Sequence, residues 1–453
     1  MASSKESNIR PTLQPLRTTG RKATIGSVAR VCSGNFLEMY DFIVFGYYAS
    51  AIAKAFFPNG NPFTSLMLSL MTFGAGFLMR PLGAIVLGTY TDHYGRRAGL
   101  LLTLALMSAG IVAIAVMPGY NQIGILAPLL VLCARLLQGF SAGLELGGVS
   151  VYLSELATPG NKGFYVSFQS ASQQVAVVFA ALIGVVLNLW LPPQHMSKWG
   201  WRIPLLVGCL IVPFLFRLRR SLQETDEFKA REHHPDMSAI LRSLRASWKL
   251  VVVGTMMATT TTVCFYMITA YTPTFGSSVL KLAPLDALVV TVCVGASNLL
   301  WLPLMGSVSD RVGRRPLLLI CATMMLMSSY PAMLWLVSAP SFSRLLVVEL
   351  WLSCLYGSYN GAMVVFLTEI MPLSIRTTGF ALAYSIATAV FGGFTPAIST
   401  YLIHRTGNRA IPGIWLSFAA ASGLAASLIA RAQSEAAPPK VNKRSMNLGE
   451  PTF

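Results

Sequence analysis

The chain has 453 residues, of which 54% are hydrophobic and only 11% are charged. A soluble globular protein carries about 25% charged residues, and a disordered chain lacks this content of large apolar side chains, so both classes are excluded. The formal charge of +17 would suggest a nucleic-acid partner in a soluble protein. Here the basic residues lie between long apolar segments, so the composition predicts an all-α membrane protein whose partner is the lipid bilayer rather than nucleic acid.

Apolar segments long enough to cross a bilayer follow one another along the chain. About 20 helical residues span the hydrocarbon core, and lipid offers no partner for free backbone groups, so such runs should be helices. We predict twelve of them, at residues 27–53, 63–89, 98–118, 123–153, 164–191, 201–218, 250–275, 285–308, 316–337, 344–371, 379–404 and 411–431. The segment before the first span is polar and basic, so we expect no cleaved signal peptide.

The distribution of Lys and Arg predicts how the chain is oriented. With the N-terminus in the cytoplasm, 24 of the 34 basic residues fall on the cytoplasmic side, seven on the opposite side and three within spans. Because cytoplasmic loops carry the excess of Lys and Arg, both termini are predicted to be cytoplasmic. The predicted parts are a tail at 1–26, a six-helix bundle at 27–218, a charged loop at 219–249, a second bundle at 250–431 and a tail at 432–453.

A ten-residue pattern occurs twice in the chain. The first copy runs from Gly88 to Arg97 and the second from Gly306 to Arg315, 218 positions later, with five residues identical in register. A second echo, 214 positions apart, joins Gly143, Gly147 and Glu155 to Gly357, Gly361 and Glu369. Each copy stands at the same place in a six-span half, and two related halves around a central site are typical of secondary transporters.

These repeated residues carry a family resemblance. The Gly-x-x-x-Asp-x-x-Gly-Arg-Arg loop resembles the signature of the major facilitator superfamily, as does the Glu369-x-x-Pro372-x-x-x-Arg376 pattern. Segments 34–42, 77–83 and 135–139 are similar to the metabolite:proton symporter family, and segments 149–155, 167–175 and 219–225 resemble its citrate-transporting members. The resemblance runs from about residue 25 to 431. It implies the major facilitator fold, with twelve transmembrane helices in two pseudo-symmetric six-helix bundles.

Arg135 is the candidate for binding a substrate carboxylate. It lies about 17 Å into the predicted fourth span at 1.5 Å per residue, where an ionisable side chain costs about 2.5–3.5 kcal/mol and needs a partner. Its planar guanidinium can donate two parallel hydrogen bonds to a carboxylate, and Gln138 lies near the same helix face. We expect Arg135 and Gln138 to contact substrate; a structural ion pair with another helix is the alternative.

Two acidic residues of the first span are candidates for proton coupling. Asn35, Glu38 and Asp41 fall on one stripe of a helix, at i, i+3 and i+6. Repulsion between the two carboxylates and their desolvation would favour the protonated form of at least one, which a proton carrier needs. The alternative is that each pairs with a basic residue, and Arg30 and Arg80 are the candidate partners. Arg80 is equally a candidate second substrate cation, and Asn35 a candidate substrate contact.

Other polar residues at similar depth offer hydrogen bonds to a carboxylate substrate. The candidates are Gln169, Gln173, Tyr266, Tyr356 and Asn360. Hydrogen bonding between helices is the alternative for the glutamines, and packing or interfacial roles are the alternative for the others. Because no basic residue lies at midplane depth in the second half, the positive charge for an anion should lie in the first half.

Charged residues gather at the predicted cytoplasmic ends of the spans. We expect them to form a breakable ion-pair gate that closes this side when the transporter faces outward; a purely topogenic role is the alternative. The predicted gate residues are Asp92, Arg96, Arg97, Glu145, Glu155, Asp310, Arg311, Arg314, Arg315, Glu369 and Arg376.

Enzymatic and metal-dependent functions find no support in the sequence. The seven cysteines each lie in an apolar run without metal spacing, and the five histidines show none either. No Gly-rich loop with a phosphate-binding Lys is present. We therefore expect neither an enzyme nor an ATP-driven pump, and no metal or cofactor besides protons as the coupling ion.

The residues and the resemblance together predict a function. We expect a monomeric proton-coupled symporter that imports citrate or a related tricarboxylate by alternating access across a bacterial inner (plasma) membrane. The same fold carrying another organic acid, such as tricarballylate or a dicarboxylate, or carrying a zwitterionic osmolyte, is the nearer alternative. A channel or receptor is the alternative from another class, against which the duplicated gate and the buried acidic pair argue.

Overall fold

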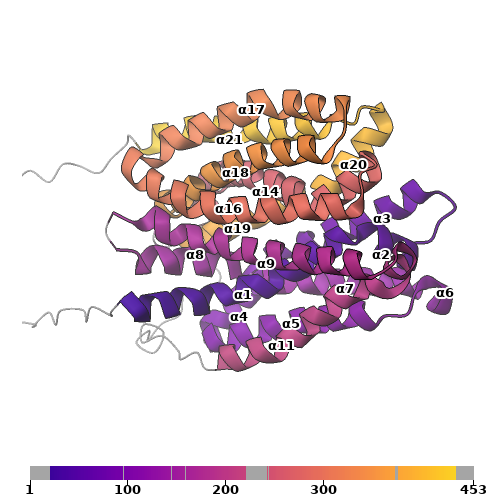
Figure 1. Cartoon of the computed structure of the whole chain (residues 1–453). Helices are drawn as coiled ribbons and strands as arrows, with labels where there is room; N and C mark the ends of the chain where they lie inside the picture. The colour runs from indigo at the N-terminus through magenta and orange to yellow at the C-terminus, as the bar shows by residue number, and fades with distance from the viewer. Residues whose placement is uncertain are drawn as a thin grey trace, which may run out of the picture.

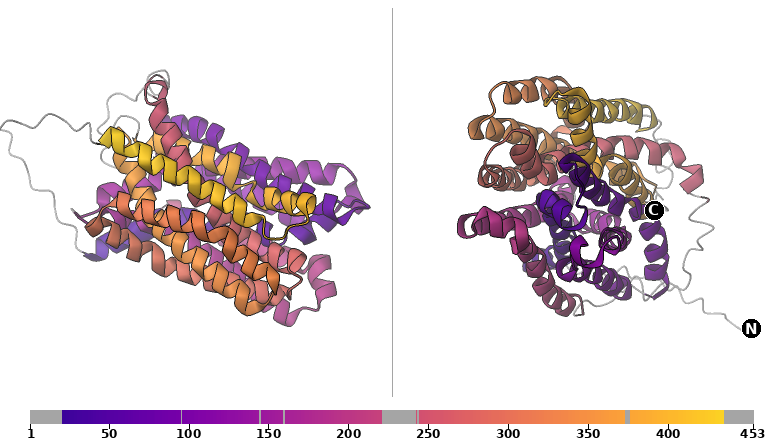
Figure 2. Two further views of the ribbon diagram at one scale, coloured as in Figure 1. Left: turned by 90° about the horizontal axis from the view of Figure 1, so that it is seen from above. Right: turned by 90° about the vertical axis from the view of Figure 1, so that its right-hand side faces the viewer.

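The computed structural model describes residues 21–94, 96–143, 145–158, 160–220, 242, 244–372 and 376–434. The regular structure within these ranges is helical throughout. The helices form two bundles that lie against each other along their length, α1 to α11 in one and α14 to α21 in the other (Figure 1). The end-on view in Figure 2 shows the same division.

The first bundle begins with a helix that is interrupted once. Its elements are α1 (Arg21–Tyr47), α2 (Ala49–Phe56), α3 (Pro62–Leu78), α4 (Arg80–Tyr94), α5 (Arg96–Val116), α6 (Tyr120–Ile123), α7 (Leu126–Ala142), α8 (Glu145–Leu156), α9 (Lys162–Trp190), α10 (Pro193–His195), η1 (Met196–Gly200) and α11 (Arg202–Arg220).

The second bundle contains short π-helical turns within its spans. Its elements are α14 (Trp248–Tyr266), η2 (Met267–Tyr271), α15 (Thr272–Thr274), η3 (Phe275–Val279), α16 (Pro284–Val312), α17 (Arg314–Ser338), α18 (Phe342–Ile370), α19 (Arg376–Ala387), η5 (Thr388–Gly392), α20 (Thr395–Thr406) and α21 (Pro412–Ser434).

The helices account for the twelve predicted spans. Within the described ranges, ten helical segments are long and apolar enough to cross a membrane, and the bent pair Pro193–Gly200 and Arg202–Arg217 makes an eleventh. The twelfth is α1 with α2, which is less apolar because α1 contains Arg30, Glu38 and Asp41. The prediction of an all-α protein with twelve membrane helices in two bundles is confirmed.

Prolines and glycines place the polar residues of the first bundle. The second span breaks between α3 and α4, where Pro81 has no N–H for the helical ladder, and Arg80 stands at this break. Beside it α7 packs directly on α3, since a Cβ on Gly139 would lie 1.6 Å from the carbonyl oxygen of Gly76. Small residues permit such close helix contact in membranes, and this contact brings Arg80 and Arg135 toward the same interior.

The outer surface is apolar. Large hydrophobic side chains are exposed on helices of both bundles, among them Leu210 on α11, Leu300 on α16 and Met327 on α17. A soluble monomer rarely exposes extended apolar surface. The interior instead holds polar side chains such as Gln169 and Asn298, which are fully buried. This distribution fits a protein whose outer face meets lipid.

Candidate functional site

Two buried ion pairs occupy the interior of the first bundle. Arg80 Nη2 lies 2.5 Å from Glu38 Oε1, and Arg135 Nη1 lies 2.9 Å from Asp41 Oδ2. Arg135 Nη1 also donates to Gln138 Oε1 at 2.8 Å. All the pairing side chains are at least 94% buried. Both acidic candidates are therefore paired with arginine in this conformation, which is the alternative to a free proton-carrying carboxylate.

The partner of Asp41 differs from the sequence expectation. Arg30 and Arg80 were the expected partners of the acidic pair; Arg80 does pair with Glu38, but Asp41 pairs with Arg135. The choice depends on the approach of α1 to α7, which no pattern within one helix specifies. The side chain of Arg30 lies outside the described part of the structure.

Aromatic rings surround both guanidinium groups. The distances from the guanidinium carbon to the ring centroids run from 4.4 to 5.7 Å. The rings are Phe42 and Phe77 for Arg80, and Phe42, Phe45 and Phe73 for Arg135. A desolvated cation over a ring face gains about 2 kcal/mol or more, so the rings offset part of the cost of burying these charges.

Several buried polar atoms of the first bundle have no hydrogen-bond partner among the described residues. They are Arg80 Nε, Arg135 Nε and Nη2, Asp41 Oδ1, both amide atoms of Asn35, and the amide nitrogens of Gln138 and Gln169. Buried polar groups are normally satisfied, and each exception needs an explanation. Most of these atoms are donors on cationic or amide groups, so the interior of this bundle has hydrogen bonds available for acceptor oxygens.

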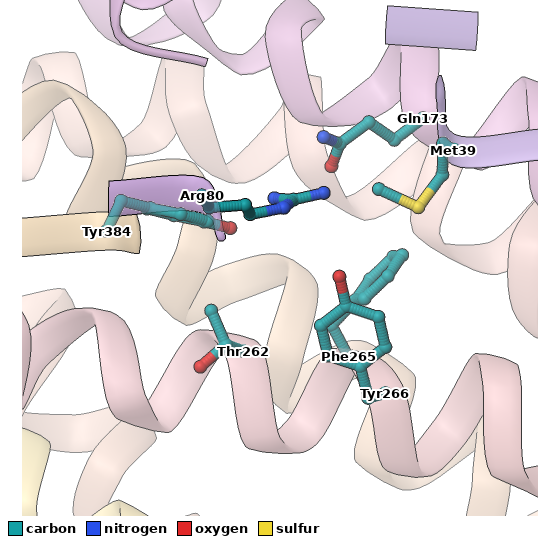
Figure 3. Close-up of a pocket in the computed structure, with 7 residues that line it drawn as sticks. All are labelled: Met39, Arg80, Gln173, Thr262, Phe265, Tyr266 and Tyr384. Carbon is teal, nitrogen blue, oxygen red and sulfur yellow. The ribbon is translucent and has the colours of Figure 1, made fainter. Parts of the chain in front are cut away.

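A small cavity between the two bundles opens onto one of the arginines. Its lining residues are Met39, Arg80, Gln173, Thr262, Phe265, Tyr266 and Tyr384. In Figure 3 the Arg80 guanidinium lies between the amide of Gln173 on one side and the hydroxyl of Tyr266 on the other, and the Tyr384 hydroxyl points toward it. The cavity holds little more than a water molecule, so its walls must separate before a larger substrate enters.

The predicted substrate residues divide into three groups. Arg80, Gln173 and Tyr266 line the cavity. Arg135, Asn35, Gln138 and Gln169 are buried within the first bundle. Tyr356 and Asn360 hydrogen-bond to each other at 3.3 Å, and the Tyr356 ring packs against Phe265 at 5.9 Å, behind the cavity wall.

Four cavity residues escaped the sequence analysis: Met39, Thr262, Phe265 and Tyr384. Tyr384 carried a usable signal, since it is a hydroxyl-bearing aromatic residue deep in an apolar span, like Tyr266. Met39 and Phe265 are apolar residues among many, and nothing in their local sequence distinguishes them. Of the consecutive glutamines, Gln173 faces the cavity, while Gln174 accepts a hydrogen bond from Asn298 of the second bundle at 3.2 Å.

Asp310 links the two bundles at one end of the molecule. Its carboxylate accepts hydrogen bonds from the backbone N–H of Gly163 at 2.8 Å and of Phe164 at 3.1 Å. These are free N–H groups in the first turn of α9, whose own N-cap residue, Asn161, makes no capping bond. A carboxylate there is favoured by the free N–H groups and by the helix dipole. A residue of the second bundle thus caps a helix of the first.

Arg314 completes this contact. Its guanidinium lies 2.6 Å from the Asp310 carboxylate and 3.3 Å from Glu369 Oε1. The backbones meet here as well, because a Cβ on Gly163 would lie 2.3 Å from the carbonyl oxygen of Gly306. Glycine at both positions is what permits the α9 and α16 backbones to touch, so this end of the bundle interface is tightly closed.

The other predicted gate residues have different surroundings. Arg315 Nε donates to the carbonyl oxygen of Ser427 within the second bundle, Arg376 Nε has no partner among the described residues, and Glu155 and Arg311 are exposed. Four predicted gate side chains lie outside the described part of the structure: Asp92, Arg96, Arg97 and Glu145.

The bundles also meet at the end opposite Asp310. The rings of Phe63 on α3 and His404 on α20 stack with centroids 3.7 Å apart. Thr274 donates a hydrogen bond to the carbonyl oxygen of Gly46 at 3.5 Å. Contacts between the bundles therefore lie on both sides of the cavity. Two bundles that enclose a small polar cavity in this way define the architecture of a secondary transporter.

Comparison with known proteins identifies the family. Residues 27–430 match the family described as Sugar (and other) transporter, and the chain belongs to that family. It is 57% identical over 408 residues to the citrate-proton symporter of Salmonella typhi, which covers 90% of this chain and 94% of that protein. The citrate-proton symporter of Klebsiella pneumoniae is also 57% identical, over 411 residues, covering 91% of this chain and 93% of that protein.

The fold is shared with a solved structure of more distant sequence. The crystal structure of a D-xylose-proton symporter is 18% identical and has a TM-score of 0.72, covering 90% of this chain and 97% of that one. The two proteins share the fold of the major facilitator superfamily. The expectation that this chain is a transporter rather than an enzyme is confirmed by the family to which it belongs.

Proposed function

We propose that this protein imports citrate, or a closely related tricarboxylate, together with protons across a bacterial inner membrane. The sequence identity of 57% to two citrate-proton symporters supports this substrate class. The observation that carries the proposal is the pair of buried arginines with unused donors, Arg80 and Arg135, in the interior of one bundle. A polycarboxylate is the ligand that such paired guanidinium groups recognise best.

Competition for the arginines couples substrate to protons in this proposal. A substrate carboxylate that enters the cavity meets the Arg80 guanidinium, which already holds Glu38 at 2.5 Å. As the arginine turns toward the substrate, Glu38 loses its counter-charge in a buried position, and a buried carboxylate without a cation takes up a proton. Asp41 takes up a proton in the same way when Arg135 leaves it to bind a substrate carboxylate.

Charge balance sets the expected stoichiometry. Moving one net negative charge into a cell whose interior is negative costs about 2.3 kcal/mol per 100 mV. Protons must therefore at least cancel the charge of the anion. We expect about three protons per trivalent citrate, and fewer if a partly protonated species is carried.

We further propose that the Asp310 end of the molecule faces the cytoplasm. The excess of Lys and Arg on that side supports this orientation, in which residues 1–26, 219–249 and 432–453 are cytoplasmic. We also propose that the monomer is the transporting unit. In a cysteine-free background, a cysteine at Asn59 should react with an impermeant reagent added to intact cells. A cysteine at Ser238, which lies outside the described residues, should not, and its reaction would reverse the orientation.

Flux measurements in reconstituted vesicles test the function. Citrate should drive proton entry, tricarballylate should compete with it, and glycine betaine should do neither. Competition by tricarballylate is expected because a site that lacks one hydroxyl contact can accept either acid. Proton entry driven by betaine but not by citrate would overturn the proposal in favour of a zwitterionic osmolyte.

A further inference from the structure

The second bundle contains a buried carboxyl group that the proposed mechanism does not use. Glu349 lies on α18, seven residues after its first residue, Phe342, which is about 10 Å along the helix axis. The residue is fully buried, with 0% of its surface exposed. An ionisable side chain within a membrane helix is costly to bury and is a candidate functional site.

Glu349 has no ion-pair partner among the residues that the structure describes. No Lys, Arg or His in the described ranges forms an ion pair with it, and its Oε2 has no hydrogen-bond partner there. The arginine on the same helix, Arg344, donates instead to the carbonyl oxygen of Trp335 and to Ser338 Oγ, each at 2.7 Å. A buried carboxylate left in this state would be uncompensated, so the neutral, protonated form is favoured.

The titratable groups on the packed elements leave this conclusion unchanged. The Cys264 thiol on α14 interacts electrostatically with Glu349 and is itself buried. The Tyr271 hydroxyl of η2 is hydrogen-bonded to Thr400. The remaining titratable side chains described on helices packed against α18 form no described ion pair or hydrogen bond with Glu349: Tyr152, Glu155, Lys162, Tyr165, Lys249, Tyr266, Asp286, Cys293, Asp310, Arg311, Arg314, Arg315, Cys321, Tyr330, Arg376 and Tyr384.

The one hydrogen-bond partner of Glu349 within the described ranges, Thr272, directly follows the π-helical turn η2 of the seventh span. The Thr272 hydroxyl lies 3.1 Å from Glu349 Oε1 and 3.2 Å from the carbonyl oxygen of Met267. A hydroxyl has one hydrogen, so it can serve two acceptors only by sharing that hydrogen between them. A proton on Glu349 removes the conflict, because the carboxyl O–H then donates to Thr272 Oγ1 and Thr272 donates to Met267.

This chain of bonds ends on the segment that carries part of the cavity wall. Met267 is the first residue of the π-helical turn η2 and directly follows Tyr266, which lines the cavity. Turns of this kind are frequent at functional sites. If Glu349 loses its proton, Thr272 turns its hydrogen to the carboxylate and the Met267 carbonyl loses that bond. The proton state of Glu349 is thereby linked to the turn beside the cavity.

We propose that Glu349 is a proton-binding site of the transport cycle, protonated in this conformation and deprotonated when the turn at Met267–Tyr271 rearranges. The inference rests on the proposed symport function. Glu349 lies between the cavity and the end of the molecule opposite Asp310, the side from which protons would enter during import. With Glu38 and Asp41 it gives three protonatable carboxyl groups, the number that the charge of citrate requires.

The test is Glu349→Gln, an amide that cannot release a proton and can still donate to Thr272. In vesicles, citrate exchange should persist, the number of protons moved per citrate should fall by one, and accumulation should fall about tenfold per unit of pH gradient. The matched control is Asp286→Asn on α16, a carboxylate of the same bundle without a described partner, which should leave the stoichiometry unchanged. An unchanged stoichiometry in Glu349→Gln overturns the inference.

A second measurement does not depend on transport or on that variant. The purified protein should show the infrared carbonyl stretch of a buried neutral carboxyl group at neutral pH. Thr272→Val should shift this band by removing its hydrogen-bond partner, whereas Thr274→Val should not. Absence of a band sensitive to Thr272→Val would overturn the assignment. Wild-type vesicles without citrate-driven proton flux would instead refute the proposed function, so the two failures are distinguishable.

Discussion

Replacing Arg80 by lysine separates its structural role from substrate binding. In the structure Arg80 Nη2 holds Glu38 at 2.5 Å, Nε has no partner among the described residues, and the guanidinium lines the cavity. A lysine ammonium keeps a positive charge opposite Glu38. It cannot provide the planar fork that donates two parallel bonds to a substrate carboxylate.

The expected magnitude follows from the bonds that lysine cannot make. A hydrogen bond to a charged group contributes about 1.5–3 kcal/mol, and each 1.4 kcal/mol corresponds to about a tenfold change in Kd. Arg80→Lys should therefore weaken citrate binding about 10- to 150-fold. Because Glu38 keeps a cation, the loss of stability should stay well below the about 3–5 kcal/mol that breaking a buried pair costs.

Binding and unfolding are measured on the same purified protein. Isothermal titration of citrate gives Kd, and thermal unfolding reports stability. Arg344→Lys, a change at a peripheral arginine of the second bundle, is the matched control and should leave Kd unchanged. Arg80→Gln should lower the unfolding temperature markedly, since it leaves Glu38 buried without a cation. If Arg80→Lys binds citrate as tightly as the wild type, Arg80 does not hold a substrate carboxylate.

Three other residues of the first bundle and one at the bundle interface give further tests. Arg135→Lys should stay folded, because a single nitrogen of Arg135 makes the bond to Asp41. It should bind citrate at least about tenfold more weakly, since the two unused donors are lost. An unchanged Kd in isothermal titration would mean that Arg135 has a structural role only. Glu38→Gln and Asp41→Asn should each lower the number of protons moved per citrate by one, and with it the accumulation driven by a proton gradient, while citrate exchange persists because exchange needs no return of an empty, deprotonated carrier. If both variants move as many protons per citrate as the wild type, these protons are carried elsewhere. Asp310→Asn should weaken the cap on α9 by about 0.5–2 kcal/mol. A cysteine at Ser167 should then be alkylated faster than the same cysteine in a protein that keeps Asp310. An equal rate of alkylation would argue against a gate at this contact.

The duplicated motif illustrates how much a pattern can predict. The sequence pointed to Asp310 and Arg314 as gate residues, and they do lie together at the bundle interface. It did not indicate that Asp310, besides pairing with Arg314, also binds the backbone of α9. Backbone N–H groups are present at every helix start, so only the position of one bundle against the other selects the helix that is capped.

Glu349 shows the opposite limit. A single acidic residue near one end of a predicted span forms no pattern in the sequence, so Glu349 is not among the predicted site residues. Its importance comes from what surrounds it, since Thr272 is its one described hydrogen-bond partner and no described cation forms an ion pair with it. Thr272 is 77 residues away in the chain.

The sequence by itself determined the number and position of the membrane helices, the two halves, and the identity of the charged residues within the spans. These features depend on runs of apolar side chains and on the cost of burying charge, both of which are local properties. Only the tertiary structure decided that Asp41 pairs with Arg135, that Gln173 rather than Gln174 faces the cavity, and that Tyr384 joins it. Such contacts depend on how each helix is rotated and how closely its backbone approaches its neighbours, and that is set by packing between segments far apart in the chain.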